Sequence, residues 1–104
     1  MSNPKLVTDE DIERVANDIR EIYTDPDAIA HTKERSSPES LKMIEFLIRN
    51  HQDKLNDARQ LCAEKAKIND PMGVAYYCGV AAEASYAVAQ LTVIAELIRK
   101  ILNP

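Results

Sequence analysis

The stretch PMGVAYYCGVAAEASYAVAQLTVIA, residues 71–95, decides the fold of this chain. It contains one charged side chain, Glu83, and is built largely from Ala, Gly, Val, Tyr and Cys. Its apolar residues recur on at least two sides of a helix, whereas an amphipathic helix of a monomer needs an apolar stripe on one side only. The stretch therefore predicts a helix that packs against a second chain as well as its own.

The composition predicts an all-α fold in one domain. The chain has 104 residues, with two Gly, one Phe and no Trp, which disfavours a turn-rich β fold. A domain of this length can bury a core but lies near the size at which association often adds stability. We therefore expect residues 1–104 to form a single helical domain.

The amino-terminal third contains one clear helix and one ambiguous segment. Thr8 is a natural N-cap followed by three acidic residues, which the positive end of a helix dipole favours. Apolar residues then recur at helical spacing, so a helix is expected over about residues 9–23. Asp25 before Pro26 is a second helix start, but few apolar residues follow it. Residues 24–37 are therefore consistent with either a short helix or a linker.

Two long helices are expected to fill the rest of the chain. Ser37 before a proline starts a helix over about residues 38–68, and Asp70 before another proline starts one over about residues 71–102. The sharp turn between them predicts a long antiparallel helical hairpin. A regular spacing of three and four residues in the first of them indicates lengthwise packing on its neighbour. We prefer a bundle-like fold over a coiled coil, because a hairpin inside a bundle gives the same pattern.

The last helix carries two apolar stripes about 100° apart. One is predicted to pack on the helix over residues 38–68. The other consists mainly of small residues, which let helix backbones approach closely, and its members are Ala75, Gly79, Ala82, Tyr86, Ala89 and Val93. The first helix, a symmetry mate, or each over part of the length could cover it. Because two-fold dimers commonly bury self-complementary patches, we predict a homodimer with this stripe as the interface.

Three side chains in the hairpin are candidates for chemistry. Cys62 and Cys78 lie eight residues either side of the expected turn, so they reach the same level. A disulfide is one interpretation, and two buried thiols, which a reducing compartment favours, are the other. His51 occupies the predicted packing stripe, and histidines in such places can change charge near neutral pH. It is therefore a candidate pH-sensitive element, with a structural histidine at the edge of the stripe as the alternative.

The sequence contains no recognised catalytic or metal-binding motif. His31 and Glu34 form a loose set with nearby aspartates, but no paired Glu-x-x-His, His-Glu-x-x-His or Cys-x-x-Cys accompanies them. No glycine-rich phosphate loop or activated nucleophile is evident either. We therefore expect no metal and no cofactor, and enzymatic activity is disfavoured.

Charge separates the possible macromolecular partners. The net charge is −4, and the acids concentrate in the first helix, where Asp11, Asp18 and Glu21 define a candidate acidic surface for a basic partner. Solubility and helix-dipole complementarity are the alternative reason for these acids. The second helix carries a basic row that could follow nucleic-acid phosphates, although acidic residues interrupt it, so nucleic acid is disfavoured. The row consists of Arg35, Lys42, Arg49, Arg59, Lys65 and Lys67.

The location and role follow mainly by exclusion. The first residues lack the basic start and apolar run of a signal peptide, and polar residues interrupt the apolar stretch, so we expect a cytoplasmic protein that does not enter a membrane. The resulting hypothesis is a small acidic homodimer that binds another macromolecule in a regulatory, inhibitory or adaptor role. The alternatives are a nucleic-acid-binding module using the second helix and a small helical enzyme with a site between subunits.

Overall fold

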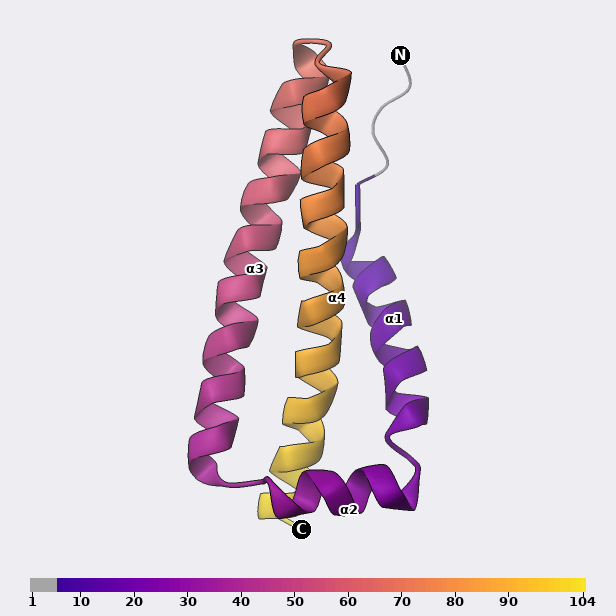
Figure 1. Cartoon of the computed structure of the whole chain (residues 1–104), viewed down its shortest axis with the longest axis vertical. Coiled ribbons are helices and arrows are strands. Elements are labelled where there is room, and N and C mark those ends of the chain that lie inside the picture. Colours follow the sequence, from indigo (N-terminus) through magenta and orange to yellow (C-terminus); the bar gives the residue numbers. More distant parts are fainter. Residues whose placement is uncertain (1–5) are drawn as a thin grey trace.

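A computed structural model describes residues 6–104, and this part of the chain is helical and contains no strand (Figure 1). The all-α prediction is confirmed. The helices are α1 (Asp9–Ile22), α2 (Pro26–Glu34), α3 (Pro38–Lys67) and α4 (Pro71–Leu102). The segment that the sequence left open between a short helix and a linker contains α2.

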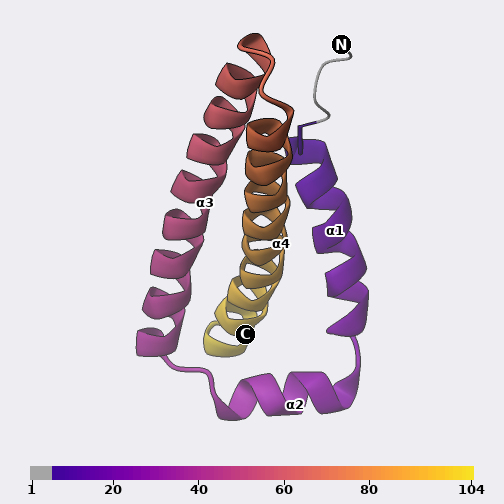
Figure 2. The same ribbon diagram turned by 45° about the horizontal axis from the view of Figure 1, so that its top comes forward.

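α4 lies at the centre of the molecule, between α3 and α1 (Figures 1 and 2). α3 and α4 run side by side in opposite directions along the long axis of a particle that measures 51 × 24 × 17 Å. α1 lies beside the carboxyl-terminal half of α4, and α2 crosses the end of the molecule to connect α1 with α3. The other end is formed by α3 and α4 and the turn between them.

Reciprocal side-chain caps mark where two of the helices begin. The Thr8 hydroxyl accepts a hydrogen bond from the backbone N–H of Asp11, and the Asp11 carboxylate accepts one from the backbone N–H of Thr8. Ser37 and Ser40 form the same reciprocal box at the start of α3. Such caps satisfy backbone donors that have no partner inside the helix. Asp25 stands at the N-cap position of α2, but its side chain makes no capping hydrogen bond there.

The turn between α3 and α4 is a compact stop-and-start signal. Asn69 adopts a left-handed backbone with φ 55°, which asparagine tolerates better than most residues. The backbone N–H groups of Asn69 and Asp70 donate to the carbonyls of Ala66 and Lys65, which closes a Schellman motif. Asp70 then caps α4 by accepting from the backbone N–H of Gly73 at 3.0 Å. Two long helices are thereby joined with almost no loop.

The core consists of two clusters dominated by alanine. In the first, Ala16 and Ile19 of α1 pack on Ala89 and Val93 of α4. In the second, residues of α3 and α4 meet, namely Leu55, Ala58, Ala81 and Ala84. Ile12 of α1 packs against both clusters. Because the buried side chains are small, the helices can lie close together along their whole contact.

Candidate functional site

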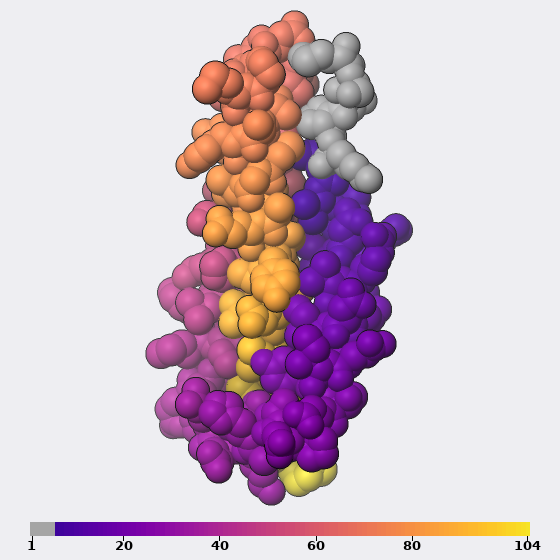
Figure 3. All heavy atoms as spheres, turned by 45° about the vertical axis from the view of Figure 1, so that its right-hand side comes forward, coloured from indigo at the N-terminus to yellow at the C-terminus, as the bar shows by residue number. Residues whose placement is uncertain are grey.

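The structure divides the predicted dimer interface into a covered part and an open part. Ala89 and Val93 are 0% and 3% exposed because α1 packs on them. They are not available to a partner while α1 stays in place. The other four residues of the predicted interface are exposed, and we call them the open stripe: Ala75, Gly79, Ala82 and Tyr86. In the space-filling view, α4 reaches the surface above the part that α1 and α2 cover (Figure 3).

The open stripe lies on a helix half with large exposed apolar side chains around it. Met72, Tyr76 and Tyr86 are 84%, 66% and 56% exposed. A Cβ placed on Gly79 would meet nothing within 4 Å, so the backbone here is bare to solvent. Small residues flanked by exposed aromatic ones are typical of a surface that another helix can approach closely.

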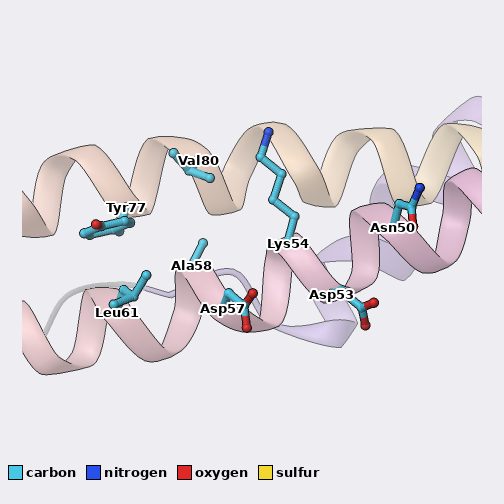
Figure 4. A pocket seen from close by; sticks show the side chains of 8 residues that line it. All are labelled: Asn50, Asp53, Lys54, Asp57, Ala58, Leu61, Tyr77 and Val80. Carbon is cyan, nitrogen blue, oxygen red and sulfur yellow. The ribbon is translucent and has the colours of Figure 1, made fainter.

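A shallow groove between α3 and α4 carries most of its polar groups on α3 (Figure 4). It has a volume of about 410 Å³, and Leu61 and Tyr77 lie toward one end of it. The Lys54 side chain extends from α3 across toward α4. The other residues that line the groove are Asn50, Asp53, Asp57, Ala58 and Val80. The sequence did not single out Lys54, because a lysine on a long helix usually belongs to a solvated face.

His51 lies in a neighbouring hollow that also touches the open stripe. The hollow has a volume of about 310 Å³, and Lys54, Glu83 and Tyr86 line it together with His51. The half-buried histidine therefore lies close to one cation, one carboxylate and a tyrosine of the open stripe. Its pH-sensitive role stays a prediction.

An ion pair that the sequence did not indicate fastens α1 to α4. Arg20 donates from Nε and Nη2 to the two carboxylate oxygens of Glu96, at 3.0 and 2.8 Å. Its Nη1 donates to Glu13 and Asn17 at 2.6 Å. The bond from Arg20 holds the pKa of Glu96 below its usual range, against the opposing effect of burial. Paired donation to both oxygens is the strong geometry for an arginine and a carboxylate.

The three residues of the predicted acidic surface differ in availability. Asp11 is half-buried, caps α1 and lies 3.3 Å from Arg14. Asp18 and Glu21 are exposed, and their carboxylates have no ion pair among the residues that the structure describes. Arg20 forms ion pairs with Glu13 and Glu96. It therefore does not neutralise Asp18 or Glu21. The available acidic surface on α1 is therefore centred on Asp18 and Glu21.

The predicted basic row is only partly available, and its first member, Arg35, lies at the end of α2 and not on α3. Arg59 donates to the carbonyl oxygen of Val7 at 2.8 Å and approaches the Asp9 carboxylate at 3.3 Å. Lys65 lies 4.0 Å from Asp70 at the turn. A nucleic-acid-binding row needs free cations to replace the counterions of the phosphates. Two of its six members are thus engaged inside the protein.

α4 is long and apolar enough to cross a membrane by length and composition alone. In its most apolar 18-residue window, 39% of the residues are buried inside the fold. The core helix of a soluble protein has the same length and composition, so the property by itself is weak evidence for a span.

The remaining polar groups and the comparisons with known proteins identify no family. Between residues 6 and 104, no group of three or more His, Cys, Asp or Glu side chains could hold a metal ion. No protein-family model matches the chain, and no curated protein or solved structure matches it either. The surfaces of α1, α3 and α4 are therefore the features that point to a function.

Proposed function

We propose that this protein is a cytoplasmic homodimer, a helical hairpin with an additional amino-terminal helix, that binds another macromolecule in a regulatory, inhibitory or adaptor role. The observation that carries the dimer is the open stripe. It continues the same face of α4 that α1 covers further along, but no helix among residues 6–104 covers it. A two-fold mate would bury it against an identical stripe.

The open stripe suits a helix of a second copy for a steric reason. Gly79 has open space at its Cβ position, and Ala75 and Ala82 add little more bulk. Two helices can then cross at short interaxial distance, with Tyr86 at the rim of the contact. Exposed tyrosine and methionine side chains are common anchors in protein interfaces.

Sedimentation of Gly79→Leu tests the dimer. Outside the backbone of its own helix, a Cβ at this position meets no atom of residues 6–104 within 4 Å, so we expect the subunit to stay folded. The substitution places a bulky side chain between two stripes. We expect a dimer at micromolar concentration for the unmodified protein and at least tenfold weaker association for the variant. Gln60→Leu adds a similar side chain at an exposed site of α3 and serves as the control. A single-chain mass for the unmodified protein, or equal association of both variants, rejects the interface.

The partner in this proposal carries a basic surface, because Asp18 and Glu21 are exposed and unneutralised on α1. Charge complementarity of this kind mainly speeds and selects association. The test is affinity capture from the native host with mass spectrometry, using Asp18→Lys with Glu21→Lys. We expect a basic partner to be lost by this variant and retained by Asp57→Lys with Glu64→Lys, which makes the same charge change on α3. Equal capture by both variants excludes the acidic surface on α1.

A further inference from the structure

The two cysteines of the chain face each other across the α3–α4 contact. The Sγ atoms of Cys62 and Cys78 are 2.8 Å apart, and both are free thiols. The turn at Asn69 places them at the same level, although 16 positions separate them in sequence. Because both are held on packed helices, they meet in the folded chain without any rearrangement of the backbone.

The surroundings give the two thiols different access to solvent. Cys62 is fully buried, and its Sγ also lies 3.7 Å from the carbonyl oxygen of Val74, an acceptor for its S–H. Burial is the main reason that the pKa of Cys62 rises to about 11, with the bond from Cys78 adding to it. Cys78 is half-buried and so is the thiol that a reagent in solution can reach. Thiolate character and access decide which cysteine reacts first.

We propose that Cys62 and Cys78 form a modification site at which a low-molecular-weight disulfide converts the two thiols into an intramolecular disulfide. Cys78 loses its proton to water and attacks one sulfur of the reagent, which forms a mixed disulfide and breaks the sulfur–sulfur bond of the reagent. The departing small thiolate takes up a proton from water and leaves as a thiol. Cys62 then loses its proton to water and attacks the Cys78 sulfur, which releases the second small thiol. Two cysteines are oxidised, and one small disulfide is reduced to two thiols.

The separation of the sulfurs suits the second step. A disulfide bond holds its sulfurs about 2.05 Å apart, so the pair needs only a small closure from 2.8 Å. Cys62 is already adjacent when Cys78 becomes the mixed disulfide. Attack within the folded chain then outpaces attack by a second molecule of small thiol. The site is therefore arranged to complete the crosslink rather than to keep the adduct.

The crosslink would fasten the end of the molecule near the turn, beyond the contact of Arg59 with Asp9 of α1. Both cysteines lie on the part of α3 and α4 that ends in the turn, away from the Arg20–Glu96 contact. A disulfide that closes a short loop removes conformations from the unfolded chain. Oxidation would thus stabilise the α3–α4 contact beneath the open stripe. The proposal stands on the thiol geometry and does not require the dimer.

The test treats the reduced full-length protein with oxidised glutathione under native conditions. We expect the intact mass to fall by two hydrogen masses, both thiols to disappear from a titration in denaturant, and dithiothreitol to restore them. Non-reducing electrophoresis should show a single-chain species. Three results would each overturn the proposal for the chain without substitutions: a stable glutathione adduct, a disulfide between chains, or two surviving thiols.

Two alanine variants separate the roles of the cysteines. In Cys62→Ala the attacking thiol remains and its resolving partner is absent, so a stable glutathione adduct on Cys78 is expected. In Cys78→Ala the buried Cys62 should stay unmodified until the protein is unfolded. Rapid native modification of Cys62 in the second variant contradicts the assigned order of attack.

Thermal unfolding of the reduced and oxidised forms provides a second readout. We expect the oxidised form to have a Tm about 10 °C above that of the reduced form, since the crosslink closes a loop of about 15 residues. Dithiothreitol should reverse the shift, and Cys62→Ala should show none on treatment. An oxidised form with an unchanged or lower Tm would mean that the crosslink strains the native contact, which rejects the stabilising role.

Discussion

The two halves of α4 have similar small apolar side chains but different surroundings. In the carboxyl-terminal half, Ala89 and Val93 are buried beneath Ala16 and Ile19 of α1. In the amino-terminal half, the residue seven positions before Ala89, Ala82, lies on the same face and is exposed. The difference lies in the cover and not in the residue type. A stripe of alanines therefore becomes core or surface according to whether a second helix reaches it.

Helix length explains why the cover stops. At 1.5 Å per residue, the 14 residues of α1 span about 21 Å, whereas the 32 residues of α4 span about 48 Å. α2 crosses the end of the molecule and adds no cover along the amino-terminal half of α4. Less than half of α4 can be shielded on this face by α1, and the open stripe lies outside that length and is exposed.

The largest contrast is expected from the same substitution at the two alanines. Ala89→Asp places a carboxylate in a fully buried apolar cluster, so we expect about 3 kcal/mol lower free energy of unfolding. Because Ala82 is exposed, Ala82→Asp should change the free energy of unfolding of the monomer by less than about 0.5 kcal/mol. Urea denaturation at a protein concentration that keeps the chain monomeric measures both. Equal losses would show that the two halves of α4 are equally covered.

The two glycines of α4 should respond to alanine with opposite signs. A Cβ on Gly73 would lie 2.6 Å from Asp70 Oδ2 and 2.8 Å from Lys65 Cγ, so Gly73→Ala should disturb the cap of α4 and cost about 1 kcal/mol. Gly79→Ala meets nothing and should gain about 0.8 kcal/mol from helix propensity. Chemical denaturation of the two variants at one protein concentration gives both values. Stabilisation by both substitutions would show that the turn accommodates the methyl group.

The Arg20–Glu96 pair, which joins α1 to the carboxyl-terminal half of α4, should make the free energy of unfolding depend on pH. The pKa of Glu96 is lowered in the folded protein. The ion pair therefore stabilises the fold above the unfolded-state pKa near 4.5, and this stabilisation is lost as the pH falls through the lower folded-state pKa. We expect Glu96→Gln to cost about 1 kcal/mol at pH 7, discounted for partial exposure, and almost nothing at pH 2.

Urea denaturation at both pH values measures this difference, with Asp18→Asn on α1 as the control. The charged groups around Glu96 are Arg20, Arg99 and Lys100, which all remain cations over this range. A loss for Glu96→Gln that is equal at both pH values would mean that packing, and not charge, holds α1 to α4.

The smallest effect is expected at His51, beside the open stripe. His51→Lys would add a second cation next to Lys54 in the hollow that Tyr86 also lines, with Glu83 as the carboxylate there. We expect the dimer of this variant to dissociate about threefold more readily than that of the unsubstituted protein. Sedimentation equilibrium measures both, with His51→Gln as the uncharged control. Equal weakening in the two variants would assign the effect to the loss of the imidazole and not to charge.

Much of the local structure could be predicted from the sequence, because it depends on neighbouring residues. Thr8, Ser37 and Asp70 cap helices where the sequence expected caps, since a cap needs only a side-chain oxygen and the next few backbone donors. Asp25 shows the limit, because it has the right residue type but makes no capping bond. Backbone geometry, and not identity alone, decides whether a cap forms.

Contacts between distant residues could not be predicted in the same way. Arg20 and Glu96 are 76 positions apart, and on the sequence each is one of many charged residues on a helix surface. The groove at Lys54 and the exposed Met72 likewise depend on which faces of α3 and α4 turn toward each other. Nothing in a local pattern distinguishes a lysine beside a groove from a lysine on a solvated face.

The sequence by itself determined that the chain is all-α and that its last long helix has more apolar surface than one partner helix covers. Helical periodicity and composition contain that information, because they act over a few residues. Only the tertiary structure decided which part of the surface stays open. α1 could have packed anywhere along α4, and its docking on Ala89 and Val93 is set by side-chain fit and by the ion pair to Glu96. These interactions depend on three-dimensional proximity, which no local pattern in the chain specifies.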